Sequence, residues 1–182
     1  MRSMAEALRL VRKFDAAPED EKSRELILAL LEQTDAPFSR RQFQPGHITC
    51  TAVVLDPAAR RVLLMHHHRL RRWLLPGGHV EEDDVTLGAA ARREAVEETS
   101  VRIAGRGRGR LVGMDVHGIP ANRKKGEPFH LHHDLIFAWA AESDEVEESE
   151  EAPEVIWCGM REFAQYDVPG SIVRAAGRAM EG

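Results

Sequence analysis

The chain has 182 residues, 43% of them hydrophobic and 30% charged, which is enough for one soluble domain with a full apolar core. Its net charge of −5 excludes a general nucleic-acid coat protein, so no stable nucleic-acid partner is expected. The chain has only two cysteines, far apart, and its charged N-terminus is unlike a signal peptide. It also has no apolar run of roughly 18 residues, so we expect a cytoplasmic protein without a membrane span.

The N-terminal part of the chain is predicted to be helical. Apolar residues recur at helical spacing within residues 1–35, and a break near Pro18 divides the pattern into two amphipathic helices. We expect a helical extension over residues 1–37 that packs on the main domain, residues 38–182, or on a second copy of the chain in a homodimer. A partner- or substrate-recognition arm is the alternative, but no residue supports it.

The next segment has the pattern of a β-hairpin. Residues 48–55 are rich in β-forming side chains, residues 56–59 are typical of a turn, and residues 61–66 give a second strand. A basic loop over residues 69–72 follows, and a short strand is expected at residues 73–75. These strands lead directly into a Pro-Gly-Gly turn.

A helix is predicted after that turn, and strands are predicted beyond it. The helix begins near Asp84 to Thr86, either of which suits an N-cap, and ends at about Thr99. Two strand pieces are expected at residues 101–104 and 111–116. The alternating glycines and arginines between them are typical of a solvated, bulged strand or turn.

The C-terminal third is predicted to contain one long strand and several short elements. A loop spans residues 117–127, the long strand covers residues 129–141, and a like-charged run over residues 142–152 forms a solvated loop. Shorter elements are expected at residues 155–157, 160–164 and 170–180. Mixed strands with one central and one terminal helix predict an α/β sandwich.

The predicted helix carries a set of carboxylates that points to a metal site. Glu94, Glu97 and Glu98 stand at i, i+3 and i+4 and so share one face, which continues backward through small or apolar residues. Three carboxylates on an inward face would repel one another unless a cation compensated them. Oxygen ligands suit a hard divalent ion, so we expect Mg²⁺ or Mn²⁺ as the cofactor.

The Gly-Gly turn and the charged helix together resemble the Nudix box, whose usual form is GX5EX7REUXEEXGU. Pro76-Gly77-Gly78 supplies the turn, and Arg93-Glu94-Ala95-Val96-Glu97-Glu98-Thr99 supplies the helical signature. Further similarity to a bacterial Nudix subgroup, including the turn Gly77-Gly78-His79-Val80-Glu81, extends it over about residues 38–165. The family implies an α/β/α sandwich with a mixed sheet, and hydrolysis of nucleoside diphosphates linked to another group.

Two positions depart from the usual box. Fourteen residues separate Gly78 from Arg93 where the pattern has thirteen, and the extra residue fits best in the turn at residues 81–84. Asp84 then stands approximately where the family has its first glutamate. Ser100 replaces the final glycine, so a strained or differently shaped helix exit is expected.

The resemblance implies a role for each matching residue. Glu97 and Glu98 are expected to bind the metal, and Glu94 to bind it or to act on metal-bound water. The main-chain carbonyl of Gly77 is a further expected ligand, and Arg93 is expected to orient a carboxylate. For the general base, two alternatives stay open: Glu94, or an acid of the 142–151 loop such as Glu142 or Glu145.

Basic and histidine residues outside the box are candidates for substrate binding. Arg69, Arg72 and His132 are the residues that we expect to bind the substrate, although arginines of this kind are as often ordinary surface cations. His130, His132 and Asp134 share one strand face. They suit a transition-metal site, a substrate cleft or a hydrogen-bonded core, and the first of these is the least favoured.

The sequence therefore predicts a Nudix-type pyrophosphohydrolase. The expected reaction is metal-dependent hydrolysis of a diphosphate linkage in a nucleoside diphosphate derivative or a related small molecule. One alternative is a non-catalytic nucleotide sensor or regulator on the same fold, which would have little need of three clustered acids. Another is a prenyl diphosphate isomerase, for which the surroundings of Cys50 and Cys158 offer no dedicated catalytic cysteine.

Overall fold

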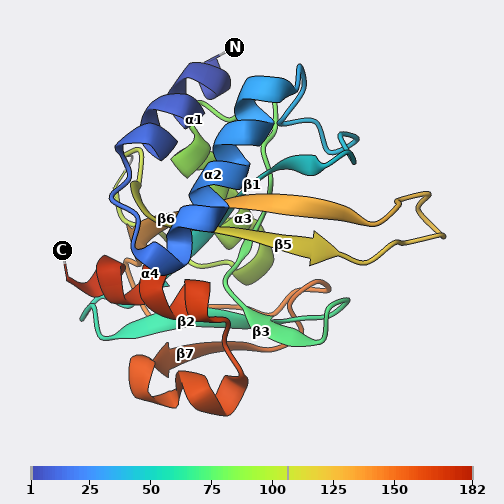
Figure 1. The fold of residues 1–182 in the computed structure, drawn as a ribbon. Coiled ribbons are helices and arrows are strands. Elements are labelled where there is room, and N and C mark those ends of the chain that lie inside the picture. Colours follow the sequence, from blue (N-terminus) through green and yellow to red (C-terminus); the bar gives the residue numbers. More distant parts are fainter. Residues whose placement is uncertain (1, 106, 182) are drawn as a thin grey trace.

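The computed structural model describes residues 2–105 and 107–181, which form one mixed sheet flanked by helices (Figure 1). The main strand order is β3-β2-β1-β6-β5, with β4 paired to β1 and β7 paired to β2. β1 and β6 run parallel, and the other strand pairs are antiparallel. The strands are β1 (Gly46–Leu55), β2 (Arg61–His67), β3 (Arg72–Leu74), β4 (Gly77–His79), β5 (Arg110–Ile119), β6 (His130–Ala140) and β7 (Val155–Gly159).

Helices cover both faces of this sheet. They are α1 (Arg2–Lys13), α2 (Pro18–Gln33), α3 (Leu87–Thr99), the 3₁₀ helix η1 (Met160–Tyr166) and α4 (Gly170–Met180). Alternate residues of β1 enter different apolar clusters: Cys50 and Ala52 pack with α3 residues such as Ala91, whereas Val53 packs with α4 residues such as Ala175. This arrangement confirms the predicted α/β/α sandwich with a mixed sheet.

Most predicted elements are present, and the errors concern short or irregular segments. A strand over residues 101–104 was expected, but Ile103 makes only an isolated bridge to Ala141. The strand expected at residues 111–116 runs on to Ile119, into the segment expected to be a loop. β4 was not predicted because three residues are too few to show a period. Residue 106, in the Gly-Arg run, lies outside the described residues.

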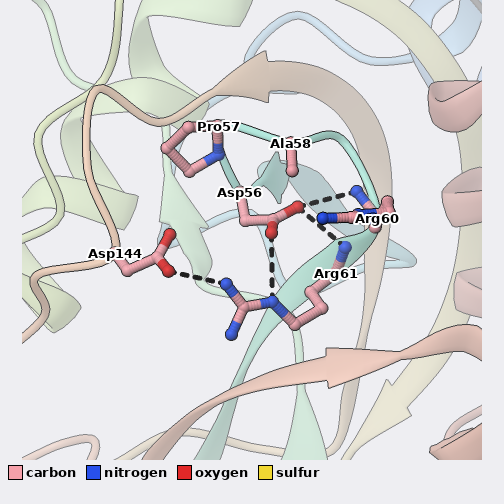
Figure 2. Close-up of a pocket in the computed structure, with 6 residues that line it drawn as sticks. All are labelled: Asp56, Pro57, Ala58, Arg60, Arg61 and Asp144. Carbon is pink, nitrogen blue, oxygen red and sulfur yellow. Dashed lines mark hydrogen bonds and ion pairs between the residues drawn. The ribbon is translucent and has the colours of Figure 1, made fainter.

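The turn between β1 and β2 is held by one buried carboxylate (Figure 2). Asp56 accepts hydrogen bonds from the backbone amides of Arg60 and Arg61, at 2.7 and 2.8 Å, and from Arg61 Nε at 3.0 Å. Arg61 also pairs with Asp144 at 2.6 Å. Burial alone would raise the pKa of Asp56, but these donors lower it on balance. The hydrogen-bonding groups around Asp56 are therefore paired with one another. The surface hollow beside them is a feature of the turn and not a candidate binding site.

The N-terminal helices pack into the same apolar core as the sheet. Ala7, Val11 and Ile27 are fully buried against residues of β1 and α3. Glu6 of α1 accepts a hydrogen bond from the Leu87 amide at 3.3 Å, at the N-terminus of α3. The domain boundary at residue 37 and a homodimer through these helices stay predictions. Within residues 2–105 and 107–181, no helix is long and apolar enough to cross a membrane.

One buried ion-pair group joins the extension to the C-terminal helix. Asp20, at the start of α2, is 2% exposed and lies 2.6 Å from both Arg174 and Arg178 of α4. Burial would raise the pKa of Asp20, but hydrogen bonds and charge from these arginines lower it below its model-compound value of 3.8. The ionised carboxylate is therefore the form that stabilises the fold.

Asp20→Asn is expected to lower the free energy of unfolding by about 2–3 kcal/mol at neutral pH. The loss is smaller than the roughly 3–5 kcal/mol typical of a fully buried pair, because the arginines keep some solvent contact. Since the folded pKa is lowered, the difference from the unaltered protein is present above pH 3.8 and shrinks as pH falls through the folded pKa. Urea denaturation over a pH series measures it. The control Glu25→Gln, at an exposed position on α2, should change stability by less than about 0.5 kcal/mol, and an equal loss in both variants would contradict the assignment.

Candidate active site

A cleft of about 920 Å³ lies between the Gly-Gly turn, α3 and the ends of the central strands. Its walls include all the residues that the sequence predicted to bind the metal, to bind the substrate or to orient the carboxylates. These are Gly77, Arg93, Glu94, Glu97, Glu98, Arg69, Arg72 and His132. The tertiary fold therefore gathers them into one place, although they come from five different segments of the chain.

The helix that carries the carboxylates is well defined at both ends. Thr86 is the N-cap, and its hydroxyl accepts a hydrogen bond from the Ala89 amide at 3.1 Å. Ser100 is the C-cap and adopts the left-handed conformation with φ 52°, and its amide donates to the Val96 carbonyl. Ser100 thus takes the left-handed backbone conformation that glycine adopts at little cost. The helix therefore ends as it would with glycine, and the expected strain falls on this serine.

Gly77 and Gly78 let the backbone of the Gly-Gly turn lie in close contact with the glutamates of this helix. The Gly77 amide donates to Glu98 Oε2 at 2.9 Å. A Cβ on Gly77 would lie 2.7 Å from the Thr51 Cα, and one on Gly78 would lie 2.7 Å from the Glu94 carboxylate. Gly77 has no room for a Cβ because the backbone of β1 lies against it, whereas a Cβ on Gly78 would push the Glu94 carboxylate out of its place.

The three carboxylates have different surroundings. Glu98 is 6% exposed, and burial raises its pKa to about 8, aided by the charge of Glu94 and opposed by the Gly77 hydrogen bond. Burial also raises the pKa of Glu94, although Arg93 opposes the shift. The Glu97 side chain is 57% exposed. Glu94 and Glu98 are thus partly or largely buried carboxylates with raised pKa values. As oxygen donors they fit a hard divalent cation, which would stabilise their charged forms.

Arg93 holds the carboxylate group together. Its Nη1 lies 2.9 Å from both Glu94 Oε1 and Glu97 Oε2. Its other nitrogens donate to Asp84, at 3.1 and 3.2 Å, and to the His79 carbonyl at 2.8 Å. These contacts are the ones that the predicted orienting role of Arg93 requires, and the role itself stays a prediction. Asp84, in place of the usual glutamate, binds the guanidinium through both carboxylate oxygens.

Sequence reasoning missed Asp115 and His117 on the opposite wall. Both lie on β5, in register with Asp134 and His132 of β6. His117 Nδ1 is 3.0 Å from Asp115 Oδ2 and 3.8 Å from Asp134 Oδ2. Burial would lower the pKa of His117, but these carboxylates raise it on balance. The polar alternation of residues 115 and 117 was the available signal, and it was lost because residue 117 was assigned to a loop.

The loop candidates for the general base lie away from the cleft. Glu145 pairs with Arg102 at an exposed position, and Glu142 is exposed beside the same residue. Among the described residues of that loop, Glu150 and Glu151 are the acids that line the cleft. Glu142 and Glu145 are therefore poorly placed for this role, whereas Glu94 and the loop acids Glu150 and Glu151 line the cleft, so both alternatives for the general base stay open.

His130, His132 and Asp134 all line the cleft, which is one of the two uses that the sequence favoured for them over a transition-metal site. The Thr49 hydroxyl donates to Asp134, and this carboxylate does not belong to the group of potential metal ligands that includes His130 and His132. The third member of that group is His47 from β1, which the sequence did not indicate because it is adjacent to β6 only in the folded sheet. On the basic wall, Arg69 pairs with Glu127 at 3.3 Å, beside Lys125.

Comparisons with known proteins agree with this geometry. The family model described as NUDIX domain matches residues 46–174. The search of curated proteins gave no match. Among solved structures, a NUDIX family hydrolase from Clostridium perfringens has 20% identity and a TM-score of 0.52, covering 74% of this chain and 96% of that one. A MutT protein from Methanosarcina mazei Go1 has 18% identity and a TM-score of 0.55, covering 74% and 92%.

A third solved structure extends over more of the chain. The NUDIX domain of Shewanella oneidensis NrtR, in a complex with ADP ribose, has 18% identity and a TM-score of 0.50. The likeness covers 85% of this chain and 96% of that one. At these identities the three solved structures show a shared fold, and the family match rests on the sequence itself.

Gly78→Ala is expected to lower divalent-metal affinity at least about 10-fold, because the new Cβ would displace the Glu94 carboxylate that Arg93 holds. Titration with Mn²⁺, monitored by electron paramagnetic resonance, measures this loss. Gly177→Ala is the matched control, since a Cβ there meets no atom within 4 Å. An Mn²⁺ affinity in Gly78→Ala equal to that of the control would contradict the role given to this glycine.

Proposed function

We propose, because this chain belongs to the Nudix family of pyrophosphohydrolases, that it hydrolyses the diphosphate linkage of a nucleoside diphosphate derivative with Mg²⁺ or Mn²⁺ as cofactor. The observation that carries the proposal is the placement of Glu94 and Glu98 and of the basic residues Arg69 and Arg72 in one cleft. Anionic and cationic walls that face the same space suit a phosphate chain bridged to the acids by a cation.

The chain's own residues divide the work of the reaction. The cation would be held by the three glutamates of α3, Glu94, Glu97 and Glu98, and by the Gly77 carbonyl. When bound, it would neutralise charge on the phosphates and lower the pKa of a water molecule. Arg93 fixes the carboxylates in place before substrate arrives, which lowers the cost of reorganisation. Glu94, with its raised pKa, is suited to accept the proton from the attacking water.

The leaving phosphate requires positive charge on the other side of the cleft. Arg69, Arg72 and Lys125 line this side and would bind the phosphate oxygens. His132 also lines the cleft and would be a polar contact for the rest of the substrate. The complex of the Shewanella oneidensis NUDIX domain with ADP ribose supports nucleoside diphosphate derivatives as the first class to test.

Glu98→Gln is expected to lower kcat/KM on the best substrate of a diphosphate panel at least about 100-fold. The buried carboxylate would contribute several kcal/mol of charge stabilisation through the cation, and each 1.36 kcal/mol is about tenfold in rate. Phosphate or nucleotide release in Mg²⁺ or Mn²⁺ measures it. Glu82→Gln, an exposed acid of the neighbouring turn outside the cleft lining, is the control and should retain full activity.

Two outcomes would overturn the proposal. Unchanged turnover in Glu98→Gln would show that the acid cluster is not the reacting site. Binding of nucleoside diphosphates without turnover of any member of the panel would favour the non-catalytic sensor on the same fold. Direct binding measurements on the unaltered protein separate a sensor from an enzyme that was tested with the wrong compounds. A sensor binds a nucleoside diphosphate of the panel without hydrolysing it, whereas compounds that are not ligands of this protein show no binding.

Arg72→Ala is expected to raise KM several-fold to tenfold with a smaller change in kcat, because removing one exposed phosphate contact weakens binding more than chemistry. Arg69→Ala should have a smaller effect, since Arg69 is already paired with Glu127. Steady-state kinetics on the same substrate measure both. Arg41→Ala, an exposed arginine outside the cleft lining, should leave KM unchanged, and an equal rise there would point to general electrostatic attraction instead of a contact.

A further inference from the structure

Three imidazoles gather in the lining of the cleft. His47 lies on β1, and His130 and His132 lie on β6, with His47 and His132 directly paired in the parallel register. One ligand-capable nitrogen of each ring lies within 4.8 Å of the other two. His47 is fully buried and His130 is 4% exposed, so two of the rings are removed from water.

Backbone contacts fix how two of these rings present their nitrogens. His47 Nδ1 is 3.0 Å from the Gln42 carbonyl, and His130 Nδ1 is 2.9 Å from the Pro128 carbonyl. A carbonyl only accepts, so Nδ1 carries the proton in both rings and Nε2 is left with a lone pair. Histidines that bind metals in proteins are oriented by the same kind of contact.

One of these lone pairs has nothing to bind it within the structure. His47 Nε2 is buried and has no hydrogen-bond partner among the described residues. A buried acceptor without a partner is unfavourable, and buried polar atoms are nearly always satisfied. The ring packs against neighbouring imidazoles, with centroids 5.1 Å from His130 and 4.9 Å from His132. A buried acceptor nitrogen that lies within 4.8 Å of two other ligand-capable nitrogens is well placed to bind a cation that all three share.

Protons are an unfavourable solution at this position. Burial lowers the pKa of His132 to about 2, aided by the neighbouring His47, and also lowers the pKa of His47. The rings are therefore neutral at physiological pH, and the neutral imidazole is the form that binds metals.

We propose that His47, His130 and His132 form a binding site for one zinc-type transition-metal ion, separate from the carboxylate site of α3. Three nitrogen donors suit Zn²⁺ or Co²⁺ and do not suit Mg²⁺, which prefers oxygen. Zinc at about 2.0–2.1 Å from each nitrogen needs nitrogens roughly 3.4 Å apart, so the rings would move inward on binding. All three residues line the cleft, and three protein ligands leave one of the four positions of a tetrahedral zinc ion for another ligand.

This site does not depend on the proposed hydrolase reaction, and its test uses metal binding alone. Full-length protein stripped with a chelator is titrated with Zn²⁺ by calorimetry in excess Mg²⁺, which occupies the carboxylate site. One zinc per chain is expected. His132→Ala should weaken zinc binding more than about 100-fold, because loss of even an outer-shell partner costs about 10–100-fold. His47→Ala should show the same loss.

Two variants serve as matched controls. His66→Ala removes a histidine of β2 that lies outside the cleft lining and should leave zinc affinity unchanged. Glu98→Gln removes a carboxylate of the other site and should also leave it unchanged, even though turnover is lost. Zinc affinity retained in both His47→Ala and His132→Ala, or lost in Glu98→Gln, would overturn the proposal.

A spectroscopic test needs no variant, and so does not depend on how the histidine variants fold. Co²⁺ bound to the unaltered protein in excess Mg²⁺ should give the intense visible bands of a four-coordinate, nitrogen-rich site. Weak bands of six-coordinate Co²⁺, or a spectrum that excess Mg²⁺ removes, would show binding to oxygen ligands only and would overturn the assignment.

Discussion

The site depends on how one guanidinium controls a set of like charges. Glu94, Glu97 and Glu98 lie on adjacent turns of α3, where burial and neighbouring negative charge raise the pKa values of Glu94 and Glu98. Arg93 contacts two of them and is itself fixed by both oxygens of Asp84. The carboxylates are thereby held close together in the absence of a cation. A divalent ion that binds here would be attracted by their negative charges, and the side chains would not first have to be ordered.

The parts of this site that the sequence could predict are those set by local spacing. The i, i+3 and i+4 pattern places the glutamates on one helix face whatever surrounds the helix, and Thr86 suits an N-cap by its own chemistry. The different environments of the three acids could not be predicted in this way. Glu98 is buried because the Gly77 amide reaches it across 21 residues of sequence, whereas Glu97 points past the turn into solvent.

The residues that the sequence did not indicate are set by strand register. Neither His47 nor Asp115 was predicted as a site residue, and both line the cleft because β6 lies between β1 and β5. A shift of one residue in either pairing would turn these side chains to the opposite face of the sheet. Glu142 and Glu145 show the converse. Their acidic run suggested a base, but Arg102 holds the start of that loop on the far side of the strands.

The three residues of β4 connect the two ends of the cleft. The Gly77 amide binds Glu98, and the absence of a side chain on Gly78 admits Glu94. The His79 carbonyl accepts from Arg93, while its imidazole packs 5.0 Å from His47. Oxygen donors thus lie at one end of this strand and nitrogen donors at the other, with β1 paired to all three residues. Because hard and borderline cations prefer different donors, the two sets of donors beside this short strand would suit different cations within a single cleft.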